Sequence, residues 1–243
     1  MKAARDAILA GIRRSLNRGP LDPETEAVLR ARVAAHRRNL VPARVAALDH
    51  KGQVDLFAAM AEAVQATVTR LSSVDAIPAA VASYLAAENL PVELVLAPDP
   101  RLDAIPWAMR PLLRIRRGRA EPADAVSLTP CLAAIAETGT LMLASGAATP
   151  TTLNFLPDTH IVLVHADQVV ASYEDGWDRL RHLAAVHDAG QQPSLPRTVN
   201  FITGPSRTGD IEQRIVLGAH GPRRLHILVV EDGRGAEHGE DRG

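Results

Sequence analysis

The sequence predicts an α/β fold in which a mainly parallel sheet is flanked by helices. From residue 92 onward, short apolar runs are bounded by Gly, Pro and Asp, a pattern typical of buried strands. Stretches with helical periodicity lie between some of these runs, so that strands alternate with helices. This alternation indicates crossover connections, which join parallel strands. The preceding residues are rich in Ala, Leu, Val and Arg and predict helices alone.

Residues 1–90 are predicted to form an N-terminal helical arm. Its first two helices are expected at 2–17 and 24–40, on either side of a linker that contains Gly and Pro. The second stretch carries an Arg-rich face that we interpret as solvated, with a docking surface as the alternative. The members of this face are Arg30, Arg32, Arg37 and Arg38.

Two further helices are predicted in the same arm. Asp55 is the expected N-cap of the first, because apolar residues follow it at helical spacing as far as Val68. Asp75 is the expected cap of the second, with Pro78 in its first turn and Pro91 beyond its end.

The α/β domain is predicted over residues 91–231. One helix is expected at 173–188, and another is expected to begin near Gly209. Residues 232–243 are mainly Gly and charged residues and predict a disordered tail. The expected strands are 92–97, 125–128, 140–144, 160–165, 198–203 and 225–231.

The composition excludes several classes of function. Lys and Arg total 27 against 28 Asp and Glu, so the net charge of −1 provides no field that would attract nucleic acid. The single cysteine, Cys131, excludes an internal disulfide and a four-cysteine iron–sulfur cluster, and we expect it to be a small core residue. No histidine pair has the spacing of metal ligands. Without a visible signal peptide or membrane span, we expect a cytoplasmic protein that binds no metal or cofactor of its own.

Two loops carry the candidate site, because ligands of open α/β sheets bind near the carboxyl ends of the strands. The first loop, residues 136–140, is placed between a short helix and a strand. Its Glu137 is the candidate catalytic residue, as an acid, a base or an acyl-accepting nucleophile. The alternative is that Glu137 fixes the turn by accepting backbone N–H bonds. The candidate ligand-binding residues of this loop are Thr138, Gly139 and Thr140.

The second loop, residues 203–212, is expected to leave a strand and open a helix. Free N–H groups at such a turn, with the positive end of the helix, form an anion-binding nest, to which Arg207 can add a bidentate contact. Asp210 and Glu212 would repel a polyphosphate, so we favour a neutral, singly charged or metal-bridged ligand. The alternative is that Thr208, Asp210 and Glu212 only cap the helix. The candidate ligand-binding residues here are Gly204, Ser206, Arg207, Thr208 and Asp210.

A basic cluster follows the first strand of the α/β region. We interpret it as a solvated sheet edge, with a surface for an acidic partner as the alternative. Its members are Arg114, Arg116, Arg117 and Arg119.

Four sequence strings occur in an order that resembles a known family. They are Ala-Ile-Ala-Glu-Thr-Gly-Thr-Leu at 134–141, Leu-Pro-x-x-His-Ile-Val-Leu-Val at 156–164, the loop 203–212, and Leu-Gly-Ala-His-Gly-Pro at 217–222. Together they resemble the LUD domain of the lactate utilisation protein C family over about residues 90–231. Residues 147–155 depart from the family pattern because they lack an Arg and a Ser, and we name no ligand-binding residue there.

The resemblance implies a fold similar to that of ribose-5-phosphate isomerase, glucosamine-6-phosphate deaminase and the CoA transferases. It also implies a non-redox component of a multi-protein system that oxidises L-lactate to pyruvate, with iron–sulfur clusters in the partner proteins. In that reading the two loops bind a small anionic ligand. The alternatives are a stand-alone acyl-transfer, isomerase or sugar-phosphate enzyme, and a ligand-sensing scaffold without catalysis.

Overall fold

The computed structural model describes residues 2–187, 195–211 and 214–231. The chain forms two compact units, Met1–Leu40 and Val41–Gly243. In the described part of the chain, no helix combines the length and the apolar character needed to cross a membrane. The predicted tail at 232–243 and Glu212 lie outside the described residues.

The first unit contains the helices α1 (Lys2–Ser15) and α2 (Pro23–Ala34), at the two places where the sequence predicts helices. The carboxylate of Asp22 accepts a hydrogen bond from Thr25 N at 2.8 Å and so caps α2. The four arginines of the predicted solvated face are exposed, and Arg30 pairs with Glu26 one turn before it.

The second unit begins earlier than the sequence predicts. The strand β1 (Thr67–Leu71) pairs in parallel with β12 (Arg224–Val230) over its whole length. Because β1 is part of the main sheet, residues 41–90 belong to the α/β domain, and the predicted boundary at 90/91 is corrected to 40/41.

The helix predicted to follow an N-cap at Asp55 begins six residues sooner and ends at Ala63, before Val68. It is α4 (His50–Ala63), and its N-cap is Asp49, whose carboxylate accepts a hydrogen bond from Gly52 N at 2.7 Å. Asp55 lies inside α4, where it pairs with Lys51 at 2.7 Å. Gln65, with a φ of 71°, lies just past its end, and Val68 lies in β1. The next predicted helix is present as α5 (Ile77–Ala87), preceded by a 3-10 turn that contains Asp75.

The main sheet has six strands among the described residues, all parallel, in the order β1-β12-β7-β4-β2-β3. This arrangement confirms the predicted α/β class with a mainly parallel sheet. The edge strand β3 escapes sequence prediction because three of its four residues are arginines. The strands not yet defined are β2 (Glu93–Leu96), β3 (Arg114–Arg117), β4 (Val126–Pro130) and β7 (Thr159–His165).

A smaller second sheet holds two of the predicted strands. Within the described ranges its order is β8-β5-β6-β9, and β6 is antiparallel to both β5 and β9. The runs predicted at 140–144 and 198–203 form β6 and β9, so they do not belong to the parallel sheet. The bounds are β5 (Ala133–Ile135), β6 (Thr140–Ala144), β8 (Val169–Val170) and β9 (Val199–Ile202).

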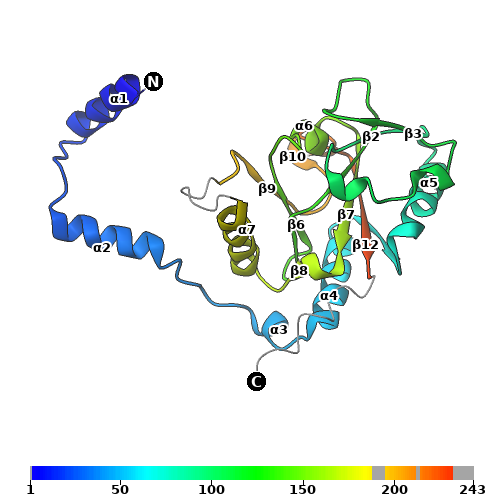
Figure 1. Cartoon of the computed structure of the whole chain (residues 1–243), viewed down its shortest axis with the longest axis horizontal. Coiled ribbons are helices and arrows are strands. Elements are labelled where there is room, and N and C mark those ends of the chain that lie inside the picture. The colour runs from blue at the N-terminus through cyan, green and yellow to red at the C-terminus, as the bar shows by residue number, and fades with distance from the viewer. Residues whose placement is uncertain (1, 188–194, 212–213, 232–243) are drawn as a thin grey trace. The chain divides into compact units, whose positions relative to one another are not determined.

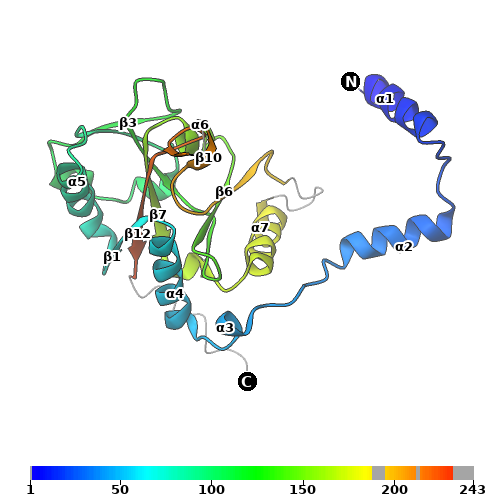
Figure 2. The ribbon, with the colours of Figure 1, turned by 180° about the vertical axis from the view of Figure 1, so that it is seen from behind.

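Three apolar clusters hold these layers together. One joins α5 to the main sheet, and another joins α7 (Tyr173–His187) to the small sheet. The third contains Phe57 of α4 together with residues of both sheets, so α4 is packed between them. Figure 1 and Figure 2 show α5 and α7 on opposite sides of this assembly, with α4 between. Cys131 belongs to the third cluster, which confirms it as a core residue.

The helix predicted near Gly209 is absent, and a β-hairpin takes its place. Its strands are β10 (Arg207–Ile211) and β11 (Arg214–Leu217), which pair antiparallel with Thr208 opposite Val216. Extended backbone is favoured here by three β-branched residues, Ile211, Ile215 and Val216. The antiparallel pairing of β10 with β11 keeps the backbone extended. Short helices at α3 (Ala43–Ala46) and α6 (Thr152–Phe155) complete the elements that matter for the site.

Candidate functional site

The two predicted loops meet through their hydroxyl groups. Residues 136–139 form the turn between the antiparallel strands β5 and β6, which corrects the predicted placement after a helix. Thr140 Oγ1 lies 2.7 Å from Thr203 Oγ1 in the second loop and 2.6 Å from Thr138 Oγ1. Tyr173 OH, at the start of α7, lies 3.1 Å from both Thr138 Oγ1 and Thr140 Oγ1. These four side chains form a hydroxyl cluster that fixes the two loops against each other.

Two glycines of the loops pack on the last turn of α4. Gly139 has a φ of +65°, and a Cβ there would lie 2.3 Å from Ala61 N. Gly204 has a φ of +77°, and a Cβ there would lie 2.4 Å from Val64 O. Both positions therefore require glycine for the close approach of two backbones. For these two residues the structure shows a packing role, and the ligand-binding role stays a prediction.

A pocket of about 250 Å³ lies beside the second loop. It is bounded by α6, by the amino ends of β7 and β12, and by the carboxyl end of β9. The candidate site was predicted at the carboxyl ends of the parallel strands. This location is corrected, because the second loop follows β9 of the small sheet and the pocket lies at the amino ends of β7 and β12. The residues that line the pocket are Asn154, Phe155, His160, Phe201, Ile202, Thr203, Gly204, Pro205, Ser206, Arg207, His220, Gly221, Pro222 and Leu225.

The pocket contains basic but no acidic side chains among its described lining residues. Arg207 is an exposed lining residue and supplies a guanidinium. The helix dipole expected to support an anion is absent, because a strand follows the loop. The side chain of Asp210 lies outside what the structure describes. Thr208 is buried in β10 and is not a lining residue.

Ser206 holds the wall of the pocket together. Its backbone N–H donates to Pro222 O at 2.8 Å, and its Oγ accepts a hydrogen bond from His220 N at 3.1 Å. Ser206 O in turn accepts from Gly218 N at 2.9 Å. Residues 203–207 and 218–222, which lie apart in the sequence, are therefore joined into one wall.

Glu137 lies in the turn between β5 and β6 and is not a lining residue of the pocket. Its carbonyl accepts a hydrogen bond from Arg44 Nη2 at 2.7 Å, and its N–H donates to Ala171 O at 3.1 Å. No hydrogen bond joins its carboxylate to a described backbone N–H, so the turn-fixing alternative has no support in the described residues. A catalytic role for Glu137 stays a prediction.

Sequence reasoning missed His160 as a pocket residue. Its side chain is fully buried, and its Nε2 lies 2.8 Å from Thr129 Oγ1. Its Nδ1 has no hydrogen-bond partner among the described residues. Burial lowers the pKa of His160 to about 3, so the ring is neutral at pH 7. The sequence shows only a histidine within the apolar run 159–164, which does not by itself indicate a pocket. Asn154 and Phe155 were also missed, because they lie in the segment that departs from the family pattern.

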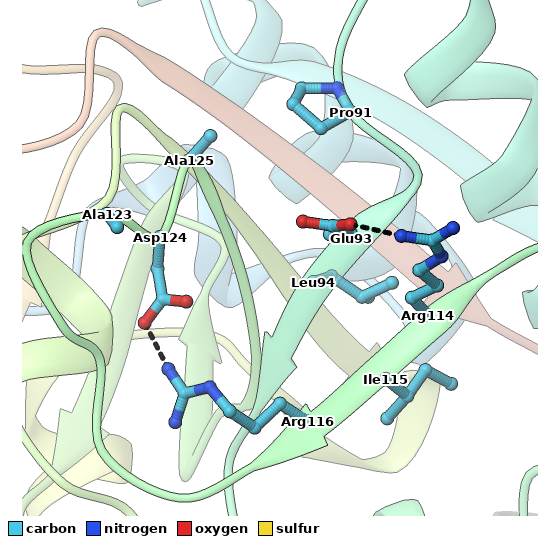
Figure 3. A pocket seen from close by; sticks show the side chains of 9 residues that line it. All are labelled: Pro91, Glu93, Leu94, Arg114, Ile115, Arg116, Ala123, Asp124 and Ala125. Carbon is cyan, nitrogen blue, oxygen red and sulfur yellow. Dashed lines mark hydrogen bonds and ion pairs between the residues drawn. The ribbon is translucent and has the colours of Figure 1, made fainter.

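A second pocket, of about 260 Å³, lies beside the edge strand β3. Figure 3 shows Arg114 turned toward Glu93, at 2.9 Å, and Arg116 turned toward Asp124. Arg117 pairs with Asp103 at 3.0 Å. These three guanidinium groups are thus paired within the chain, and the pocket offers an anion no unpaired positive charge from its described lining.

Comparisons with known proteins agree with this architecture. The LUD domain model matches residues 54–230, so it includes most of α4 and all of β1 and α5. A crystal structure of a DUF162 family protein from Deinococcus radiodurans superposes with a TM-score of 0.52 and 25% identity, covering 75% of this chain and 99% of that one.

Curated relatives point to the same family. "Lactate utilization protein C" of Deinococcus radiodurans is 33% identical over 166 residues, which is 68% of this chain and 73% of the relative. The protein of the same name from Geobacillus sp. strain WCH70 is 38% identical over 100 residues, and that match spans only 39% of the relative's length. On these matches, the chain belongs to the LUD domain family.

Proposed function

We propose that this chain is a non-redox component of a multi-protein system that oxidises L-lactate to pyruvate. In this proposal it binds a small anionic ligand in the pocket beside residues 203–207. Relatives named for lactate utilisation support the first part. The second part rests on the geometry of the pocket.

The observation that carries the proposal is the charge of the pocket lining. Arg207 is a lining residue, and no Asp or Glu is present among the described lining residues. A guanidinium binds a carboxylate through two parallel hydrogen bonds, a geometry that suits a small organic acid. The volume of about 250 Å³ lies below the range of roughly 300–1,000 Å³ that is usual for drug-sized ligands. A ligand with few heavy atoms fits it best.

The redox part of the reaction is assigned to partner proteins. The chain has one cysteine, and that residue is buried in the core. Burial raises the pKa of the Cys131 thiol to about 12, which keeps it protonated and unreactive at neutral pH. Oxidation of lactate releases two electrons, and we assign their transfer to iron–sulfur proteins that act with this chain.

Replacement of Arg207 by Ala is expected to weaken binding of L-lactate and pyruvate by roughly 10- to 100-fold, because a charge-assisted hydrogen bond is lost. Isothermal calorimetry on the full chain measures this directly. Arg110→Ala is the matched control, since Arg110 is exposed and is not a lining residue. Equal affinities for the wild type and Arg207→Ala would remove the pocket from the proposal.

The role in the system is tested by growth. A strain that lacks the gene and has no paralogue should not grow on L-lactate as its sole carbon source. The wild-type gene should restore growth, and the Arg207→Ala gene should restore it poorly. Undiminished growth of the deletion strain would contradict the assignment to lactate oxidation, whatever the pocket binds.

A further inference from the structure

We infer that His160 binds a second oxygen of the ligand, so that the pocket selects small monocarboxylates with a hydroxyl or oxo group on the carbon next to the carboxylate. This inference rests on the proposed function, since it takes the pocket as the site of a small organic anion. It adds a specificity-determining residue and a substrate class.

The first observation is the unequal use of the two ring nitrogens. His160 Nε2 lies 2.8 Å from Thr129 Oγ1, whereas Nδ1 has no hydrogen-bond partner among the described residues. A buried polar group without a partner is costly, and each one in a native structure needs an explanation, of which contact with a ligand is one. His160 is completely buried and is also a lining residue of the pocket. The unpartnered nitrogen therefore belongs to a side chain at the ligand site.

The second observation is the position of the ring in the sheet. Thr129 lies on β4, which borders β7 on one side, and β12 borders β7 on the other. His160 is directly opposite Leu225 of β12, and Leu225 is also a lining residue. The bond to Thr129 thus uses Nε2 on the β4 side, and Nδ1 is the ring nitrogen left without a partner among the described residues.

The two hydrogen-bond donors, the imidazole of His160 and the guanidinium of Arg207, suit different groups of a ligand. When Thr129 donates its hydroxyl proton to Nε2, the proton of the neutral imidazole is on Nδ1, which then acts as a hydrogen-bond donor. A neutral donor suits a hydroxyl or oxo oxygen, and the guanidinium of Arg207 suits the carboxylate. The pair matches the two oxygen-bearing ends of a 2-hydroxy or 2-oxo acid. Apolar Phe155, Phe201 and Leu225 line the same pocket and suit a short alkyl group.

Two substitutions distinguish the proposed hydrogen bond from Nδ1 to the ligand from the structural hydrogen bond between Nε2 and Thr129. In His160→Gln the amide nitrogen occupies the position of Nε2, so the bond to Thr129 is retained while the Nδ1 donor is lost. In His160→Asn the amide nitrogen occupies the position of Nδ1, so the donor is retained while the bond to Thr129 is lost. Calorimetry of each full-length variant with L-lactate, pyruvate and propionate gives the preference for a second oxygen, because propionate lacks it.

The wild type is expected to bind L-lactate and pyruvate about tenfold more tightly than propionate, the size of effect that one hydrogen bond provides. His160→Gln should bind all three acids about equally, and His160→Asn should keep the preference. If the wild type binds propionate as tightly as L-lactate, or if His160→Gln keeps the preference, the inference about His160 is overturned while the anion site stands. If no acid binds to the wild type, the anion site itself fails, and this result is distinct from the previous two.

Discussion

Gly139→Ala should destabilise the α/β domain by roughly 2–5 kcal/mol, the sum of the cost of left-handed backbone for a residue with a Cβ and the cost of overpacking. The φ of +65° at this position is unfavourable for alanine. The new Cβ would also lie 2.3 Å from Ala61 N and 2.5 Å from Met60 C. Both atoms belong to the backbone of α4, so no side-chain rotation relieves the clash.

Urea unfolding of the wild type and the variant measures this difference in free energy. Gly146→Ala is the matched control, because the nearest atom to its new Cβ is Thr149 Oγ1 at 3.5 Å and its backbone is not in the left-handed region. The control should stay within about 0.5 kcal/mol of the wild type, as surface substitutions usually do. Equal unfolding midpoints for both variants would show that the loop can move away from α4.

Acidification from pH 7.5 to pH 5.0 should lower the free energy of unfolding by about 4 kcal/mol through two buried histidines. Burial lowers the pKa of His160 to about 3 and that of His226 to about 4, from an ordinary value of 6.5. Between these values the unfolded chain binds protons that the folded chain excludes. Stability is therefore complete above pH 6.5 and decreases as the pH falls below it. At pH 5.0 each histidine accounts for about 2 kcal/mol of the loss.

This pH window separates the histidines from the paired carboxylates. Hydrogen bonds from Lys51 and Arg70 lower the pKa of Asp55 below 3.8, and those from Arg70 lower the pKa of Glu231 below 4.5. The stability that such carboxylates contribute is present above these ordinary values and is lost only below them. A loss measured between pH 6.5 and pH 5.0 therefore reports the histidines.

Urea unfolding at both pH values tests this assignment in variants. His160→Gln and His226→Gln should each remove about half of the acid-dependent loss, whatever their stability at pH 7.5. His182→Gln is the control, because His182 is exposed on α7 and should leave the loss unchanged. An acid-dependent loss of the same size in all three variants would assign it to other groups. His226, which stacks on Tyr84 with ring centroids 3.9 Å apart, gives an independent measurement away from the pocket.

The central parallel strands could be predicted because each one is locally apolar. β7 is buried at its first six positions, so its residues alone identify it. β1 could not be found in this way, because its sequence Thr-Val-Thr-Arg-Leu is only half buried and its place depends on pairing with β12, far away in the chain. The hairpin of β10 and β11 was missed for a different reason. Its two strands are adjacent in the chain and pair with each other, but its glycine and acidic residues have the local pattern of a helix start.

In the candidate site, too, residues with a local sequence pattern could be predicted, and residues placed by distant parts of the chain could not. Arg207 and Ser206 could be identified from the loop itself, because their residue types suit anion binding and turn formation. His160 could not, because its role depends on Thr129 from one neighbouring strand and on a wall built from residues 203–207 and 220–222. A pocket assembled from several segments is a property of the packing.

The last turn of α4 is a segment in which the domain should not tolerate a change in chain length. Gly139 and Gly204 both lie against its backbone, at Ala61 and Val64. One residue inserted there would rotate this turn by about 100° and displace the supports of both loops together. The pocket would then be lost although every residue that lines it is unchanged. Insertions are therefore tolerated least at residues 60–64, and length variation among natural sequences should be absent from that segment.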